Sequence, residues 1–278
     1  MITDFYQITL IYLEETILKS KLSTILTALS ATAVLSFATN ASAYQIFFGE
    51  DLNNSGTTPL SSIPYSSTAE TSFKSFLSGV GTETFESKTP GATAPLILTF
   101  PGFGGSSLNA TLSGGNGSVT SVPSGTAAAG RYSIPSASST NFWEASAGDN
   151  GSFTITFGQS IAALGFYGID IGDFGGQLTL GLSNGDNFIV SNTVGSNGST
   201  DGTVLYYGLI AQSLAEEFTS IRFNTTASQG DVFAFDNFTI GSRQQVCQQG
   251  CGNVPEPATL ALLGLGLAGL GVARKRKA

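Results

Sequence analysis

The sequence predicts an all-β protein whose main domain is a β-sandwich with a jelly-roll-like arrangement of strands. The chain has 278 residues, of which 35 are glycine and only 11% are charged, whereas soluble domains average about 25% charged residues. Short runs alternate apolar and polar residues, as in 153–157, and a period of two is typical of half-buried strands. Turns rich in glycine and asparagine, such as 114–117 and 184–187, separate these runs.

The alternating runs place the expected elements along the chain. We expect strands at 84–86, 96–100, 108–112, 118–122, 151–157, 161–167, 177–182, 187–192, 203–208, 220–224 and 232–240, and one short helix at 73–79. The sandwich therefore spans residues 83–242. A Ser/Thr-rich segment, 44–82, precedes it, and a cysteine-containing stem, 243–253, follows it.

The N-terminal region, residues 1–43, reads as an extension followed by a signal peptide with a signal helix. Lys19 and Lys21 precede an apolar stretch at 22–37, and Ala41 and Ala43 form a small-x-small cleavage site for signal peptidase. The alternative is a membrane anchor, but Ser23, Thr24, Thr27, Ser30 and Thr32 interrupt the stretch, which is shorter than the roughly 20 residues of a span.

The C-terminal region, residues 254–278, has three parts in a fixed order. Val254, Pro255, Glu256 and Pro257 come first, an apolar run at 258–273 follows, and Arg274, Lys275, Arg276 and Lys277 close it. The prolines prevent helix upstream, the apolar run predicts a helix at the short limit of a membrane span, and the basic cluster favours the cytoplasmic side.

This order closely resembles the PEP-CTERM sorting signal of exported bacterial proteins, also catalogued as an ice-binding-protein C-terminal domain. The resemblance implies that an exosortase recognises Pro255, Glu256 and Pro257. It also implies that the basic residues Arg274 to Lys277 retain the C-terminal end at the membrane. It also implies transient membrane anchoring through the helix, cleavage near Pro-Glu-Pro and release to the cell surface. The alternative is an ordinary anchor with a proline linker.

A second resemblance covers the sandwich. Phe142-Trp143-Glu144, the segment 165–177 and Asp231 to Asn237 are similar to a domain that recurs in PEP-CTERM proteins, together with Glu83 to Glu86. The resemblance implies an extracellular jelly roll related in shape to carbohydrate-binding modules, with no established ligand.

Composition excludes several classes of function. The chain has no histidine, which removes Ser-His-Asp and Cys-His nucleophile systems, His-ligated zinc and an imidazole base. Residues 44–253 hold 15 acidic and five basic side chains, a net charge of −10. An acidic body without a basic face is a poor nucleic-acid binder.

Two pairs of carboxylates are candidate ligands for a structural Ca²⁺. Glu86 and Asp236 follow phenylalanines at the ends of the first and last expected strands, which a calcium ion commonly joins in jelly-roll binding modules; Glu83 and Asp231 are reserve ligands. Ca²⁺ requires six to eight hard oxygen ligands. The alternative is that Asp236 and Asn237 close a turn or satisfy buried amides.

Asp170 and Asp173 share a glycine-flanked loop at 168–176. They could chelate a cation or, less plausibly, act as the acid and nucleophile of a glycoside hydrolase. The alternative is a solvated loop in which the aspartates close turns on backbone amides.

Aromatic residues are mostly phenylalanines at alternating positions, which predicts core. Those that could stack on a sugar are Trp143, Tyr132, Tyr167, Phe174, Tyr206 and Tyr207. Trp143 is the best candidate glycan platform, although a single tryptophan in a sandwich is more often core. Tyr206 and Tyr207 are adjacent on a strand, so they face opposite sides and only one is expected in the core.

Cys247 and Cys251 are the two cysteines of the chain. In an exported protein such a close pair predicts a small disulfide loop, and without histidine it is a weak zinc site.

Together these features predict an exported, non-enzymatic protein of the cell surface that binds or scaffolds extracellular polysaccharide. The rival is a carboxylate-dependent carbohydrate-active enzyme. Ice binding rests on a catalogue name alone, because the chain lacks a recurring Thr-x-Thr array.

Overall fold

The structure is a computed structural model, and we describe residues 44–195, 200–227 and 230–247. The predicted signal helix and the predicted C-terminal apolar helix lie outside these ranges. Within the described residues, no helix is long and apolar enough to cross a membrane.

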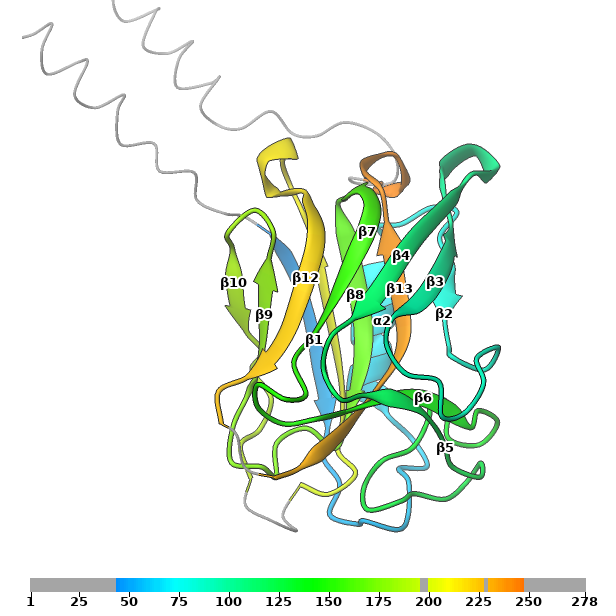
Figure 1. Cartoon of the computed structure of the whole chain (residues 1–278), viewed down its shortest axis with the longest axis vertical. Helices are drawn as coiled ribbons and strands as arrows, with labels where there is room; N and C mark the ends of the chain where they lie inside the picture. Colours follow the sequence, from blue (N-terminus) through cyan, green and yellow to red (C-terminus); the bar gives the residue numbers. More distant parts are fainter. Residues whose placement is uncertain (1–43, 196–199, 228–229, 248–278) are drawn as a thin grey trace, which may run out of the picture. The chain divides into compact units, whose positions relative to one another are not determined.

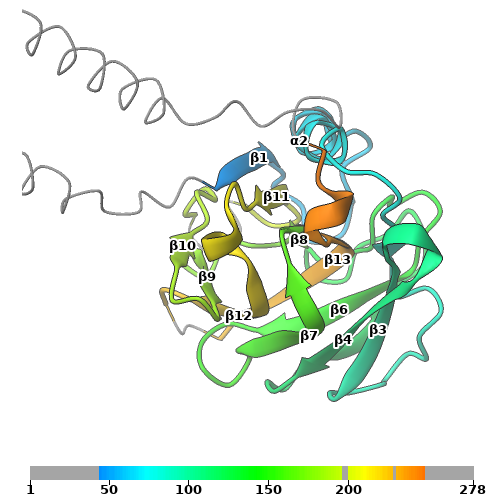
Figure 2. The ribbon, with the colours of Figure 1, turned by 90° about the horizontal axis from the view of Figure 1, so that it is seen from above.

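Two antiparallel sheets pack face to face (Figures 1 and 2). The first has the order β1-β11-β8-β13-β6-β5, with β2 also paired to β13, and the second has the order β10-β9-β12-β7-β4-β3. The strands of the first are β1 (Gln45–Asp51), β2 (Thr82–Glu83), β5 (Ser118–Ser121), β6 (Asn141–Ser146), β8 (Ala163–Ile169), β11 (Val204–Ile210) and β13 (Val232–Gly241). Those of the second are β3 (Leu96–Pro101), β4 (Ser107–Ser113), β7 (Phe153–Ile161), β9 (Leu178–Leu182), β10 (Asn187–Ile189) and β12 (Phe218–Thr225). The predicted β-sandwich is confirmed.

The core between the sheets consists mainly of phenylalanine. Strands such as β4 and β7 bury every second residue over much of their length, so each contributes one apolar row to the interface. Phe153 stacks on Phe223 with a centroid distance of 4.5 Å, and Phe235 meets Phe153 edge to face at 5.2 Å. The alternation seen in the sequence therefore reports burial between two sheets.

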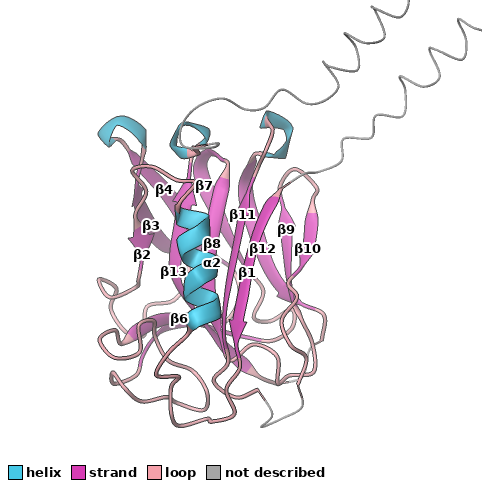
Figure 3. Ribbon diagram, turned by 180° about the vertical axis from the view of Figure 1, so that it is seen from behind, coloured by secondary structure: helices cyan, strands magenta, loops and turns pink. Residues whose placement is uncertain are grey.

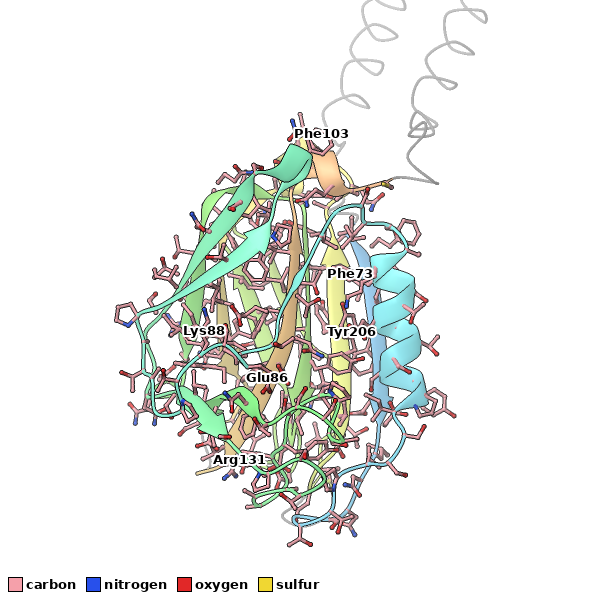
Figure 4. The ribbon with its side chains drawn as sticks, turned by 90° about the vertical axis from the view of Figure 1, so that its right-hand side faces the viewer. Phe73, Glu86, Lys88, Phe103, Arg131 and Tyr206 are labelled. Atoms are coloured by element: carbon pink, nitrogen blue, oxygen red, sulfur yellow. The ribbon has the colours of Figure 1, made fainter. Side chains whose placement is uncertain are left out.

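A second apolar core lies on the outer face of the first sheet. The helix α2 (Pro64–Lys74) covers β1 and β11 there (Figure 3). Phe73 of α2 faces Tyr206 of β11 (Figure 4), with ring centroids 5.9 Å apart. The expectation that only one of Tyr206 and Tyr207 is core is wrong: both are buried, because the sheet is covered on both faces.

The helix lies earlier than predicted, at 64–74 instead of 73–79. Its start, after Ile63, has no side-chain cap of its own. Asp51, at the end of β1, accepts hydrogen bonds from the backbone N–H groups of Tyr65 (3.1 Å) and Ser66 (2.8 Å) instead. A carboxylate at this position accepts hydrogen bonds from the unpaired N–H groups of the first turn and interacts favourably with the helix dipole. Because this cap comes from a residue 15 positions upstream, the local sequence pattern does not reveal it.

Two strands were not predicted and one was misplaced. The sequence pattern predicts no strand at β1 or β6, but both pair with neighbours within the first sheet. The strand expected at 84–86 is instead β2, and Phe85 has a φ of 58°, which ends it.

Candidate functional site

Glu86 and Asp236, the predicted calcium ligands, both bind protein donors. Asp236 Oδ2 accepts hydrogen bonds from Ser133 Oγ (2.7 Å) and Ile134 N (2.8 Å), and Asp236 Oδ1 accepts one from Asn237 N (2.7 Å). Glu86 Oε1 accepts from Thr140 N and Asn141 N, both at 2.8 Å. Asp236 thus holds the segment before β6 against β13, as the alternative interpretation of Asp236 expects, and Glu86 holds the start of β6 against the loop after β2. Calcium at this pair stays a prediction.

The reserve ligand Glu83 is also occupied. It accepts a hydrogen bond from Phe85 N at 2.9 Å and lies 3.3 Å from Lys88 Nζ. Asp236 is fully buried, and this burial raises its pKa to about 8.

Trp143 is not a glycan platform. Its side chain is fully buried between the sheets and meets Phe153 edge to face at 6.1 Å. The other proposed stacking residues, Tyr132, Tyr167, Phe174, Tyr206 and Tyr207, are buried as well. Sequence alternation cannot separate core aromatics from surface ones when both faces of a sheet are covered.

Four aspartates meet at one end of the first sheet; we call them the four-aspartate cluster: Asp170, Asp173, Asp201 and Asp231. Asp170 and Asp173 follow β8, Asp201 precedes β11, and Asp231 immediately precedes β13. These strands are neighbours in the order β11-β8-β13, and antiparallel pairing places the end of β8 beside the starts of the other two. The loops gather at the lower end of the sandwich in Figure 1.

The carboxylates of this cluster are close together. One oxygen from each of Asp170, Asp173 and Asp201 lies within 4.8 Å of the other two. Asp173 also lies within hydrogen-bonding range of Asp231. Sequence analysis had singled out Asp170, Asp173 and Asp231 in separate contexts but missed Asp201, since only the strand order brings the turn before β11 to this place.

Backbone geometry fixes Asp170 in the cluster. Its φ of 65° turns the chain sharply after β8, its backbone N–H donates to Thr203 O at 2.8 Å, and its Oδ1 accepts from Gly202 N at 2.8 Å. Gly130 packs directly on the carboxylate, because a Cβ there would lie 2.0 Å from Oδ1.

Burial and like charge raise the pKa values of Asp170, Asp173 and Asp231. Burial, followed by the charge of Asp173, raises the pKa of Asp170 to about 7. Burial and the adjoining Asp231 and Asp201 carboxylates raise the pKa of Asp173 to about 8. Burial raises the pKa of Asp231 as well. The positive charge that acts on Asp170 and Asp231 is Arg131 (Figure 4), which is itself paired with Glu144 at 2.9 Å.

A groove of about 770 Å³ lies along the edge strand β1 and the neighbouring helix α2. Its lining includes the exposed side chains of Ile46, Phe48 and Tyr65, with the hydroxyl groups of Thr68 and Ser72. Glu50, at its edge, accepts hydrogen bonds from Thr193 N at 2.9 Å and Thr193 Oγ1 at 2.6 Å. The groove lies on the segment 44–82, where sequence analysis placed no site.

The remaining predicted site residues are terminal. Ala41 and Ala43 of the cleavage site, Val254 to Pro257, and Arg274 to Lys277 lie outside the described residues, as does Cys251. Cys247 is disulfide-bonded; its pairing with Cys251 stays a prediction.

The solved structures to which this chain is similar include an adhesin domain and a carbohydrate-binding module. The K2 cleaved adhesin domain of Lys-gingipain is 13% identical, with a TM-score of 0.35, and the alignment covers 58% of this chain and 97% of that domain. The family 11 carbohydrate-binding module of the cellulosomal cellulase Lic26A-Cel5E of Clostridium thermocellum is 13% identical, with a TM-score of 0.24, covering 54% and 96%. At these scores the likenesses carry no argument about function. No curated protein sequence matches the chain significantly.

The C-terminal region gives a specific match. Residues 253–277 match the PEP-CTERM protein-sorting motif, in agreement with the order of prolines, apolar run and basic cluster. Such a motif implies sorting by an exosortase. The chain therefore carries a PEP-CTERM sorting signal, which indicates an exported protein.

Proposed function

We propose that this exported protein is a non-catalytic module that binds or scaffolds extracellular polysaccharide at the cell surface. The observation that carries the proposal is the groove along β1 and α2, which is lined by the exposed aromatic residues Phe48 and Tyr65 and by the hydroxyl-bearing residues Thr68 and Ser72. An aromatic face covers the C–H face of a sugar, and nearby polar groups bind its hydroxyls.

Exposure of the rings supports a binding role for the groove. Tyr65 is 70% exposed and Phe48 is 37% exposed, although the aromatic side chains of the two cores are buried. Water-exposed apolar surface next to polar groups is typical of interaction sites. A groove along an edge strand also suits a chain-like ligand, since successive sugar units can contact successive side chains.

The carboxylates support binding over hydrolysis. A glycoside hydrolase holds its two carboxyl groups about 5 to 9.5 Å apart with the scissile bond between them. In the four-aspartate cluster, one oxygen from each of Asp170, Asp173 and Asp201 lies within 4.8 Å of the other two, and Asp170 is buried. This arrangement suits shared binding of one cation better than an acid and a nucleophile on either side of a scissile bond.

Affinity electrophoresis of the purified full-length protein through gels containing bacterial exopolysaccharide tests the proposal. We expect retarded migration of the wild type, and Tyr65→Ala should weaken binding at least tenfold because stacking is lost. Phe103→Ala is the matched control: Phe103 is 56% exposed but lies in the turn between β3 and β4, at the opposite edge of the sandwich.

Equal retardation of all three proteins would contradict a role for the groove, and no retardation by any polysaccharide would contradict binding. Hydrolysis is tested separately by incubation with the same polysaccharides. Release of reducing ends that is lost in Asp173→Asn would overturn the non-catalytic assignment.

A further inference from the structure

The four-aspartate cluster has an excess of negative charge that the described residues around it do not balance. Four carboxylates share the space, and Arg131, the cation that acts on two of them, is already bound to Glu144. Like charges held this close repel strongly in partly buried surroundings. A cluster of this kind is stable at neutral pH only with protons or a cation between the oxygens.

Unpartnered oxygen atoms at the same place point to a ligand. Asp173 Oδ1 and Asp231 Oδ2 are buried and accept no hydrogen bond within the described part of the chain. Buried oxygens without a partner are rare in folded proteins and call for an explanation.

Thr200 provides an independent observation. Its side chain is 3% exposed, and its Oγ1 is buried without a hydrogen-bond partner in the described structure. The hydroxyl lies close to Gly172, since a Cβ on Gly172 would be 3.4 Å from it, and Gly172 stands between Asp170 and Asp173 in the sequence. Thr200 is thus a neutral oxygen donor at the edge of the carboxylate cluster.

The set of donors selects the class of ligand. The candidate ligand atoms are all hard oxygens: they belong to the four carboxylates and to the Thr200 hydroxyl, and none of them is nitrogen or sulfur. Hard divalent cations prefer such oxygens. The donors come from separate loops, after β8, before β11 and before β13. Ca²⁺ accepts six to eight oxygen ligands in flexible geometry, whereas Mg²⁺ requires a strict octahedron. A site built from several loops with many oxygens therefore suits Ca²⁺ better than Mg²⁺.

We propose that Asp170, Asp173, Asp201 and Asp231, with Thr200, bind one Ca²⁺ ion at this end of the sandwich. The ion joins the loop after β8 to the starts of β11 and β13 and neutralises the carboxylates. This site is distinct from the Glu86 and Asp236 pair, whose oxygens are occupied by protein donors. It does not depend on sugar binding.

Calcium titration of the purified full-length protein, stripped with EDTA and dialysed, tests the site. Isothermal titration calorimetry should give one Ca²⁺ per chain. Ca²⁺ at about a hundred times its dissociation constant should raise the melting midpoint by about 5 to 10 °C, and the same concentration of Mg²⁺ should raise it much less.

Variants separate the cluster from the rest of the molecule. Asp173→Asn should lose at least tenfold in Ca²⁺ affinity, and its EDTA-treated form should melt no lower than the wild type, because the substitution removes repulsion. Asp186→Asn makes the same change in the β9–β10 turn, outside the cluster, and should keep the full calcium shift.

Three results would overturn the proposal: no calcium-dependent shift in the wild type, an undiminished shift in Asp173→Asn, or an equal shift with Mg²⁺. Should Asp173→Asn fail to fold, Thr200→Val serves instead. It leaves all four carboxylates in place and should still lower Ca²⁺ affinity; an unchanged affinity would remove Thr200 as a ligand and with it the independent support for the site.

Discussion

Two aspartate sites, Asp236 and the four-aspartate cluster, differ in how their buried oxygens are satisfied. Asp236 is more deeply buried, yet its carboxylate accepts hydrogen bonds from Ser133, Ile134 and Asn237. In the four-aspartate cluster, Asp173 and Asp231 instead face other carboxylates and keep buried oxygens without donors. Burial alone therefore does not indicate a ligand site; the absence of donors does.

The largest expected effect belongs to Asp236→Ala. The substitution leaves the N–H groups of Ile134 and Asn237 and the Ser133 hydroxyl without their buried acceptor. At about 1 to 3 kcal/mol for each unsatisfied buried group, we expect the free energy of unfolding in urea to fall by about 3 to 5 kcal/mol. A loss below about 1 kcal/mol would mean that these hydrogen bonds do not anchor the segment before β6.

Gly172→Ala should disrupt the loop that carries the cluster. Gly172 has a φ of 135°, and a Cβ there would lie 2.3 Å from Thr193 O. Strain and overlap together should cost about 2 to 3 kcal/mol, measured by the same urea unfolding. Gly175→Ala is the control, since Gly175 has a φ of 74° with open space around it and should cost only about 1 kcal/mol. Similar losses in both variants would exclude the steric contribution at Gly172.

The pH dependence of stability should report on Asp236. Its pKa is raised to about 8 by burial, whereas an unfolded aspartate has a pKa of about 4. Between these values the folded state holds a proton that the unfolded state has lost, so stability falls as pH rises and is lowest above pH 8.

The limiting slope for one such group is about 1.4 kcal/mol per pH unit. Asp236→Asn, which cannot titrate, should remove this contribution, and the difference between the two proteins should therefore change across pH 5 to 8. A constant difference over that range would show that the pKa of Asp236 is not raised in the folded protein.

The smallest expected effect, but the most direct contrast, comes from Asp231→Asn. In the presence of EDTA at pH 8, the variant should be more stable than the wild type by about 1 kcal/mol, because the amide removes a like charge and can donate a hydrogen bond to Asp173. Asp236→Asn should instead lose stability under the same conditions, since an amide offers only one acceptor atom. Destabilisation in both variants would erase the distinction between the two sites.

The sequence by itself determined the fold class and the sorting of the protein for export. Alternating apolar residues in strands such as β4, β7 and β9 reflect the period of the backbone, and the PEP-CTERM order at residues 253–277 is a linear signal. Both are local in the chain, so both could be recognised without coordinates.

Only the tertiary structure decided which residues meet. Asp201 joins Asp170 and Asp231 because β11, β8 and β13 are neighbours in the sheet. Helix α2 starts where Asp51 caps it, and the same helix buries Tyr206 on the face that alternation alone would leave to solvent. Trp143 is buried because a second sheet covers it. Each outcome depends on contacts between residues distant in the chain, and a local pattern carries no information about its non-local partner.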